Sequence, residues 1–185
     1  MERNYAAFID GGYLDCVLRR EFAAPRIDYA KIAKWMTAGE EPIRIYYYHC
    51  LPYLSTPATE EEQLRYNRKS GFFRRLEALP NFTVRLGRLE RRNQDLTGHQ
   101  TFIQKRVDMM LGLDLVNLAV KRRITQAAIF TGDSDFLPAI EMAKAEGVVI
   151  TLCHGQAPRA HEELTLVCDR ESLLTEETIK KIQRD

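Results

Sequence analysis

The sequence predicts an α/β fold: a three-layer α/β/α domain with a mainly parallel central sheet. Short apolar runs alternate with helical patterns along most of the chain. This alternation is typical of parallel strands joined by right-handed crossover helices. The 185 residues contain no evident linker, repeat or low-complexity segment, so we expect a single domain over residues 1–185.

The first part of the chain predicts a strand, two helices and a second strand. Residues 5–9 are continuously apolar, which is typical of a buried strand. Residues 12–21 and 29–36 have helical patterns, and the second helix should end before Gly39. Residues 43–49 are rich in Ile and Tyr, which favours a strand.

The middle of the chain predicts two long helices around a short strand. A helix over 60–79 begins with three glutamates, which suit the positive end of its dipole. A short strand should follow at 82–86, and 87–98 is polar, basic and expected to be irregular. Over 107–123 the apolar residues recur at helical spacing, which predicts the central helix.

The last third continues the alternation less clearly. Strands are expected over 127–130 and 148–152, and 164–168 is a candidate final strand. Helices are expected over 136–146 and 175–182.

Composition favours an ordinary globular protein of the cytoplasm. The chain is 45% hydrophobic and 29% charged, and it shows neither a long apolar span nor a signal-peptide pattern at its start. The four cysteines are scattered without a CxxC pair, which predicts free thiols and argues against a zinc site. The four histidines show no metal-ligand spacing.

Positive charge is concentrated in one stretch, although the chain as a whole has a net charge of only +1. Residues 65–106 hold eleven Lys and Arg against three Asp and Glu, a local excess of +8. Such a surface can attract a polyanion such as a nucleic acid. A solvated helix face followed by a basic loop would explain the same charges.

Acidic residues follow the apolar runs at two places. Asp10 follows the strand at 5–9, and Asp133 and Asp135 follow the strand at 127–130. Because parallel strands end at the same edge of a sheet, these carboxylates should converge if the strands are neighbours. Asp108, in the first turn of the central helix, could face the same crevice. Clustered carboxylates repel one another without a cation, so the cluster predicts a Mg²⁺ or Mn²⁺ site.

Each acidic residue also has a structural explanation. Asp10, Asp133 and Asp135 could cap or stabilise the helices that follow them, which is worth roughly 0.3 to 1 kcal/mol. Asp108 could pair with Lys105 or Arg106. Asp114 lies six residues beyond Asp108, about 240° further round an ideal helix, so it need not point the same way.

Three segments together resemble the signatures of the NYN domain, a family of PIN-like nucleases. They are residues 8–12 (FIDGG), residues 105–108 (KRVD) with Asp114 downstream, and residues 131–138 (TGDSDFLP). Their order and spacing match the family over about 5–152, leaving 153–185 as a C-terminal extension packed on the same domain.

The resemblance implies a PIN-like, Rossmann-like fold and a metal-dependent endoribonuclease. Asp10, Asp108 and Asp133 match the metal-binding positions and Asp135 the accessory acidic position, all four being candidate catalytic residues. Tyr13 stands where the first motif usually carries Asn.

The expected reaction is hydrolysis of an RNA phosphodiester, in single-stranded or structured RNA, by water activated by Mg²⁺ or Mn²⁺. We expect a first set of residues, all basic, to bind the phosphates that flank the cleaved bond, and Ser134 to bind phosphate as well. We expect a second set, which surrounds the acidic residues, to orient them. The first set is Arg88, Arg91, Arg92, Lys105 and Arg106, and the second is Tyr13, Thr131 and Asp114.

Other functions stay open. An RNA-binding module could retain the acidic cluster as a degenerate nuclease site, and the same residues would serve a DNA nuclease. A Mg²⁺-dependent phosphatase of the haloacid dehalogenase type is disfavoured, because Gly12 replaces the second Asp of that pattern. RNA is the expected partner, and no association with a membrane is expected. A homodimer is possible.

Overall fold

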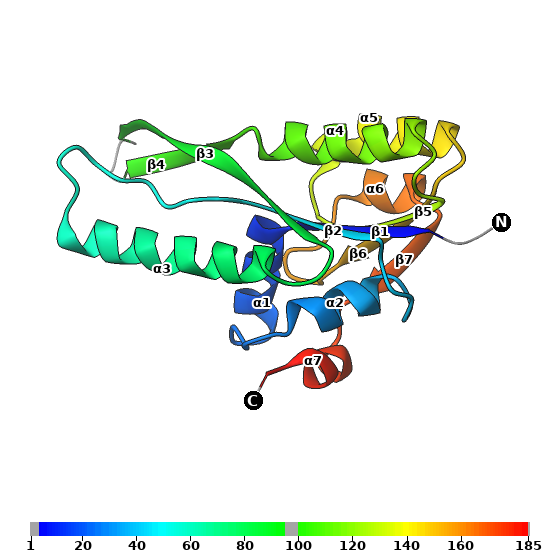
Figure 1. The fold of residues 1–185 in the computed structure, drawn as a ribbon, viewed down its shortest axis with the longest axis horizontal. Helices are drawn as coiled ribbons and strands as arrows, with labels where there is room; N and C mark the ends of the chain where they lie inside the picture. Colours follow the sequence, from blue (N-terminus) through cyan, green and yellow to red (C-terminus); the bar gives the residue numbers. More distant parts are fainter. Residues whose placement is uncertain (1–3, 95–99, 185) are drawn as a thin grey trace.

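The computed structural model describes residues 4–94 and 100–184, with side chains described except at 91–94, 100, 101, 103 and 104. Its helices and strands alternate as the sequence predicts (Figure 1). In chain order they are β1 (Tyr5–Asp10), α1 (Gly11–Glu21), α2 (Tyr29–Met36), β2 (Arg44–Cys50), α3 (Glu60–Glu77), β3 (Phe82–Gln94), β4 (Gln100–Lys105), α4 (Val107–Val120), β5 (Gln126–Phe130), the 3₁₀ turn η1 (Ser134–Phe136), α5 (Leu137–Ala145), β6 (Val149–His154), α6 (Glu162–Val167), β7 (Arg170–Leu173) and α7 (Glu176–Ile182).

Within the described residues the sheet has seven strands in the order β4-β3-β2-β1-β5-β6-β7. Six of them run parallel, and β4 is antiparallel at one edge. The first strand of the chain, β1, therefore lies in the middle of the sheet between β2 and β5. The prediction of an α/β fold with a mainly parallel sheet is confirmed.

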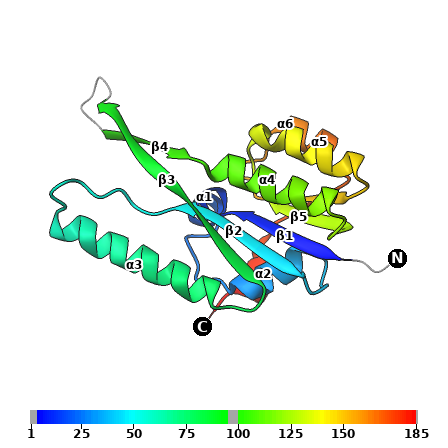
Figure 2. The same cartoon turned by 45° about the horizontal axis from the view of Figure 1, so that its top comes forward.

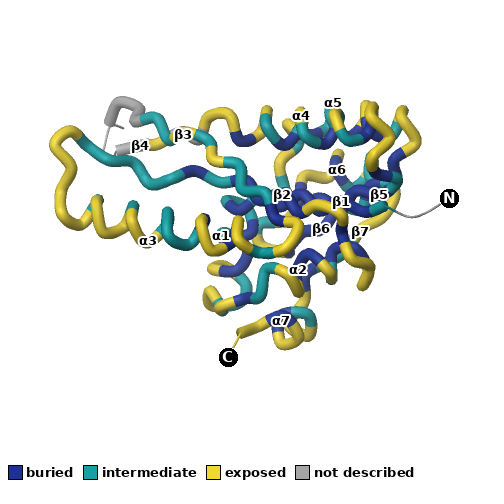
Figure 3. Tube along the Cα trace, viewed as in Figure 1, coloured by how far each residue is buried: buried dark blue, intermediate teal, exposed yellow. Residues whose placement is uncertain are grey.

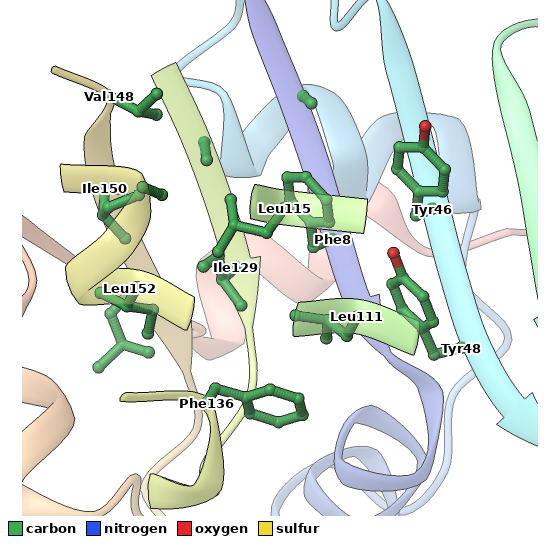
Figure 4. Packing of buried hydrophobic residues seen from close by; sticks show 14 of the residues in the cluster. Phe8, Tyr46, Tyr48, Leu111, Leu115, Ile129, Phe136, Val148, Ile150 and Leu152 are labelled. Carbon is green, nitrogen blue, oxygen red and sulfur yellow. The ribbon is translucent and has the colours of Figure 1, made fainter. Parts of the chain in front are cut away.

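Two hydrophobic clusters, one on each face of the sheet, make up the three layers. Alternate residues of β1 divide between them, so that Phe8 joins one cluster and Ile9 the other. The first cluster packs α4, α5 and α6 against the sheet, with Leu111 and Leu115 fully buried (Figure 4). The second packs α1, α2, α3 and α7. Figure 3 shows the central strands buried and the outer helix faces exposed.

One side of the molecule extends beyond this body. The N-terminal half of α3, the connecting segment 51–59, the C-terminal part of β3 and its partner β4 project past the end of β1, as Figures 1 and 2 both show. The C-terminal end of β1 points toward this projection, so α3 and the β3–β4 strands extend beyond the edge of the sheet where sites form in such folds.

Two sequence predictions about local structure are wrong. An irregular segment is predicted over 87–98, but over residues 87–94 β3 continues because β4 pairs with it and Leu89 packs against the core, while 95–98 lie outside the described residues. Residues 164–168 were expected to form a strand, but they lie largely in helix α6. Leu164 and Val167 are three residues apart and both pack inward, a helical spacing, and the final strand is β7.

Candidate active site

Asp10 ends the central strand β1 and caps the next helix. Its Oδ1 accepts hydrogen bonds from the backbone N–H groups of Gly12 (2.9 Å) and Tyr13 (3.1 Å). Burial raises the pKa of Asp10 to about 6, and the charge of Asp108 adds to that rise against the two N–H groups. Asp10 therefore caps α1, and its ionised form is destabilised by burial and by the nearby charge of Asp108.

Asp108 lies in the first turn of α4. We call residues 105–107, which connect the end of β4 to the start of that helix, the neck. The N-cap residue of α4, Arg106, has a left-handed backbone conformation with φ 77°. The Asp108 side chain is exposed. Its pKa is raised by partial desolvation and then by the charges of Asp133 and Asp135.

Asp133 and Asp135 follow β5, the neighbour of β1 in the sheet. The buried Thr131 fixes the turn, because its Oγ1 accepts a hydrogen bond from the Asp133 N–H at 3.2 Å. Asp133 in turn caps η1 by accepting from the Asp135 N–H at 3.0 Å, and both carboxylates are exposed. As predicted, Asp133 is a cap.

The four aspartates form one group of interacting charges at the C-terminal edge of the sheet. Ile9 pairs with Phe130, so Asp10 and the Thr131 turn leave adjacent strands at the same level. Asp108 links the two strand ends, since it raises the pKa of Asp10 and is itself raised by Asp133 and Asp135. Among residues 4–94 and 100–184, however, no three Asp, Glu, His or Cys side chains are grouped closely enough to hold a metal ion.

The sequence model of the NYN domain matches residues 4–174. The chain belongs to the NYN domain family. Members of this family are generally nucleases, ribonucleases among them, and NYN and PIN-like nucleases typically depend on a divalent metal ion.

One solved structure has a fold similar to that of this NYN domain. It is similar to a protein of unknown function from Vibrio parahaemolyticus RIMD 2210633, with a TM-score of 0.60 and 16% identity over 95% of each chain. MurG of Acinetobacter baumannii has a TM-score of 0.40 and 11% identity over 93% of this chain and 42% of MurG, too little similarity to carry an argument. The sequence has no significant match among curated proteins. No helix in the described part of the NYN domain is long and apolar enough to cross a membrane.

Tyr13 closes one side of the acidic group. Its hydroxyl donates to the carbonyl oxygen of Pro158 at 2.7 Å, and its ring lies against Gly132 and Phe130. An added Cβ at Gly132 would come within 2.4 Å of that ring. In this NYN domain Tyr13 thus joins α1 to the turn that carries Asp133.

Asp114 lies in a network apart from the four aspartates. Its Oδ2 accepts from the Tyr48 hydroxyl (3.0 Å) and from Nε of Arg85 (3.0 Å), and Oδ1 accepts from Nη2 of the same arginine (3.3 Å). Tyr48 is fully buried in the core between α4 and β2. The contacts of Asp114 therefore tie α4 to the sheet.

We expect Asp114→Ala to lower the free energy of unfolding by about 1 to 3 kcal/mol, because it leaves the buried Tyr48 hydroxyl without its acceptor. Tyr48→Phe, which removes that hydroxyl instead, should cost less. Chemical denaturation with and without Mn²⁺ checks this: the extra stability given by Mn²⁺ should be the same in Asp114→Ala as in the wild type. A loss of the Mn²⁺ effect would place Asp114 in the ion site.

The predicted phosphate-binding residues are placed unequally. Arg88 is exposed beside the neck, Arg106 is exposed within it, and Ser134 is half-buried next to Asp133. Lys105 forms an exposed ion pair with Glu90, 2.8 Å between Nζ and Oε2, and does not pair with Asp108 in the structure. The side chains of Arg91 and Arg92 lie outside the described residues.

Sequence reasoning missed a second charged group beside Asp10. Asp15 accepts from Lys69 at 2.9 Å, and its Oδ2 lies 3.1 Å from Nε2 of His49. Burial opposes ionisation of Asp15, but these partners hold its pKa below the usual range, and the charge of His49 also favours ionised Asp10. The residues come from α1, β2 and α3, so no local spacing signals them; only the position of His49 at a strand end could have done so.

Proposed function

We propose that this NYN domain is a metal-dependent endoribonuclease and that Asp10, Asp108 and Asp133 bind the ion, with Asp135 beside them. The single observation that carries the proposal is the group of four aspartates at the C-terminal edge of the sheet, in which burial raises the pKa of Asp10 and of Asp108 and the charges of neighbouring aspartates raise both further. Such unrelieved repulsion is characteristic of a site that a cation completes.

The donor set suits a hard cation. All four side chains offer carboxylate oxygens, the ligands that Mg²⁺ and Mn²⁺ prefer. Burial and the charges of Asp108 and Asp10 raise the pKa of the nearby Cys50 thiol to about 11, so it is protonated at neutral pH in the ion-free protein, and hard cations such as Mg²⁺ and Mn²⁺ prefer oxygen ligands to sulfur. Mg²⁺ is commonly held by one or two carboxylates with water and substrate phosphates, so a preassembled group of three ligands is not required.

When bound, such an ion acidifies a water molecule and neutralises charge on the phosphate. The chain supplies orientation. Backbone N–H groups hold Asp10 and the Thr131 hydroxyl holds the turn of Asp133, so two of the proposed ligands are fixed by their own capping bonds. Arg88 and Arg106 would bind flanking phosphates, which predicts binding that weakens with salt.

The test compares cleavage of labelled single-stranded RNA and DNA by the wild type and by Asp133→Asn, with Mg²⁺, Mn²⁺ or EDTA. Asn still caps a 3₁₀ or helical turn, so the variant should fold. We expect cleavage of RNA that needs the ion and falls at least about a hundredfold in the variant. Asp28→Asn is the matched control, because Asp28 caps α2 in the same way and pairs with Arg184.

The alternatives give different results. Cleavage that survives both EDTA and Asp133→Asn would exclude the metal mechanism. RNA binding without cleavage would identify a binding module with a degenerate site. Preference for DNA would reassign the substrate, and release of phosphate from small phosphomonoesters would favour a phosphatase.

A further inference from the structure

A pocket of about 260 Å³ lies where the projecting part of the molecule meets the sheet. Its walls come from the end of β2, the segment after it, α3 and the β3–β4 hairpin, the parts that extend past β1 in Figures 1 and 2. The lining is of two kinds: apolar or aromatic side chains and cations. They are Pro52, Tyr53, Leu89 and Phe102, with Arg65 and Lys69; His49 and Cys50 at the end of β2 complete the lining.

The aromatic side chains leave ring surface open to solvent. Tyr53 and Phe102 lie with ring centroids 5.3 Å apart at an interplanar angle of 44°. Phe102 is 44% exposed although it is a large hydrophobic residue. Two tilted rings with an accessible face make a platform on which a flat aromatic ligand could stack.

The cations stand on one face of α3, because Arg65 and Lys69 are four residues apart. Arg65 is exposed. Lys69 is held by its ion pair with Asp15, 2.9 Å from Nζ to Oδ2, and lies 5.3 Å from the ring centre of Phe72. The pocket therefore presents positive charge beside its aromatic wall, which suits a ligand with both an aromatic ring and a negative group.

The pocket adjoins the acidic group. Two of its lining residues, His49 and Cys50, end β2, and β2 pairs with β1 at the level of Asp10. Both residues interact electrostatically with Asp10, and Cys50 also with Asp108. A ligand that fills the pocket would thus lie at the same edge of the sheet as Asp10, beside the strand that carries it.

We propose that this pocket binds one nucleobase of the RNA strand, next to the phosphate that is cleaved, and that the substrate is therefore single-stranded at that position. This inference rests on the proposed nuclease function. Stacking on Tyr53 and Phe102 requires a free base face, which a base inside a duplex lacks. Arg65 and Lys69 bind the backbone of the same or the adjacent nucleotide.

The test uses a series of short unstructured RNAs that each carry one abasic nucleotide at a different position. Binding is measured in EDTA by fluorescence anisotropy. The KM and kcat of cleavage are measured with Mn²⁺. At one position relative to the cleavage site the missing base should weaken wild-type binding about 5- to 100-fold. Phe102→Ala should weaken binding of intact RNA to a similar extent and remove the penalty at that position. Phe102→Tyr, which keeps an aromatic ring, should restore both the binding of intact RNA and the abasic penalty. Leu166→Ala, a 77% exposed residue on α6, is the matched control.

The outcomes separate this inference from the nuclease proposal. An abasic penalty in binding that depends on Phe102, with no cleavage, supports the pocket and overturns the nuclease. Metal-dependent cleavage with equal KM at every abasic position overturns the pocket alone. Equal binding of a duplex RNA, or no binding of single-stranded RNA, also overturns it.

Discussion

Asp10→Asn should abolish cleavage and at the same time make the ion-free protein more stable at neutral pH. Burial raises the pKa of Asp10 from 3.8 to about 6, so its charge is unfavourable in the folded state. A shift of about 2 pKa units corresponds to up to about 3 kcal/mol. Asn keeps the cap on α1 without the charge, and loses the proposed ligand.

The pH dependence has a definite sign. The folded protein takes up a proton on Asp10 more readily than the unfolded chain, so this group favours folding below about pH 4. That contribution is lost as pH rises to about 6. Denaturation curves in EDTA between pH 4 and about 8 should therefore show the stability of Asp10→Asn relative to the wild type rising with pH, mostly between pH 4 and about 6.

Asp28→Asn serves as the control, since Asp28 has the same cap geometry and a positive neighbour, Arg184. It should leave cleavage intact and not raise stability at neutral pH. If Asp10→Asn proves less stable than the wild type at pH 7, the buried and repelled charge of Asp10 does not destabilise the folded protein, and the main support for a cation is removed.

Gly87→Ala should lower both stability and cleavage. Gly87 lies in β3 beside the neck that leads into α4. An added Cβ would stand 2.6 Å from the carbonyl oxygen of Lys105 and 2.6 Å from Cγ2 of Val107. One of these contacts is backbone, so the neck must shift, at a cost of about 1 to 3 kcal/mol. Asp108 follows Val107 directly and would move with it.

Gly71→Ala is the matched control for that prediction. Gly71 lies inside α3, where an added Cβ meets only Nη1 of Arg75 at 3.6 Å among its close neighbours. It should stabilise the protein by roughly 0.5 to 1 kcal/mol, because Ala favours a helix over Gly. Chemical denaturation and the RNA cleavage assay measure both variants. Unchanged stability in Gly87→Ala would show that the neck moves freely and does not fix Asp108.

Much of the fold was predictable from local pattern. The continuous apolar run at 5–9 and the three glutamates that open α3 gave correct elements, because burial and helix dipoles act on neighbouring residues. The length of β3 was not predictable in this way, since its polar half is a strand only through pairing with β4. The helix α6 was missed because six residues are too few for a clear period.

The residues of the candidate site likewise differ in whether their positions could be predicted from local sequence. Asp10 and Asp133 could be placed from sequence, because each directly follows a buried parallel strand and such strands end at one edge. The partners of Asp15 and Asp114 could not, since His49, Lys69, Tyr48 and Arg85 are distant in sequence. Sequence order carried no information about which side chain would meet which.

The central position of β1 also has a consequence for how the chain reaches its native state. One partner, β2, is made soon after β1, but Tyr5 pairs with Gln126 of β5, roughly 120 residues later. During synthesis the edge of β1 that awaits β5 stays open until more than two-thirds of the chain is available. Such non-local pairing slows folding and exposes an apolar strand to aggregation. The proposed ligands Asp10 and Asp133 therefore come together late, and a truncation before β5 would leave no site at all.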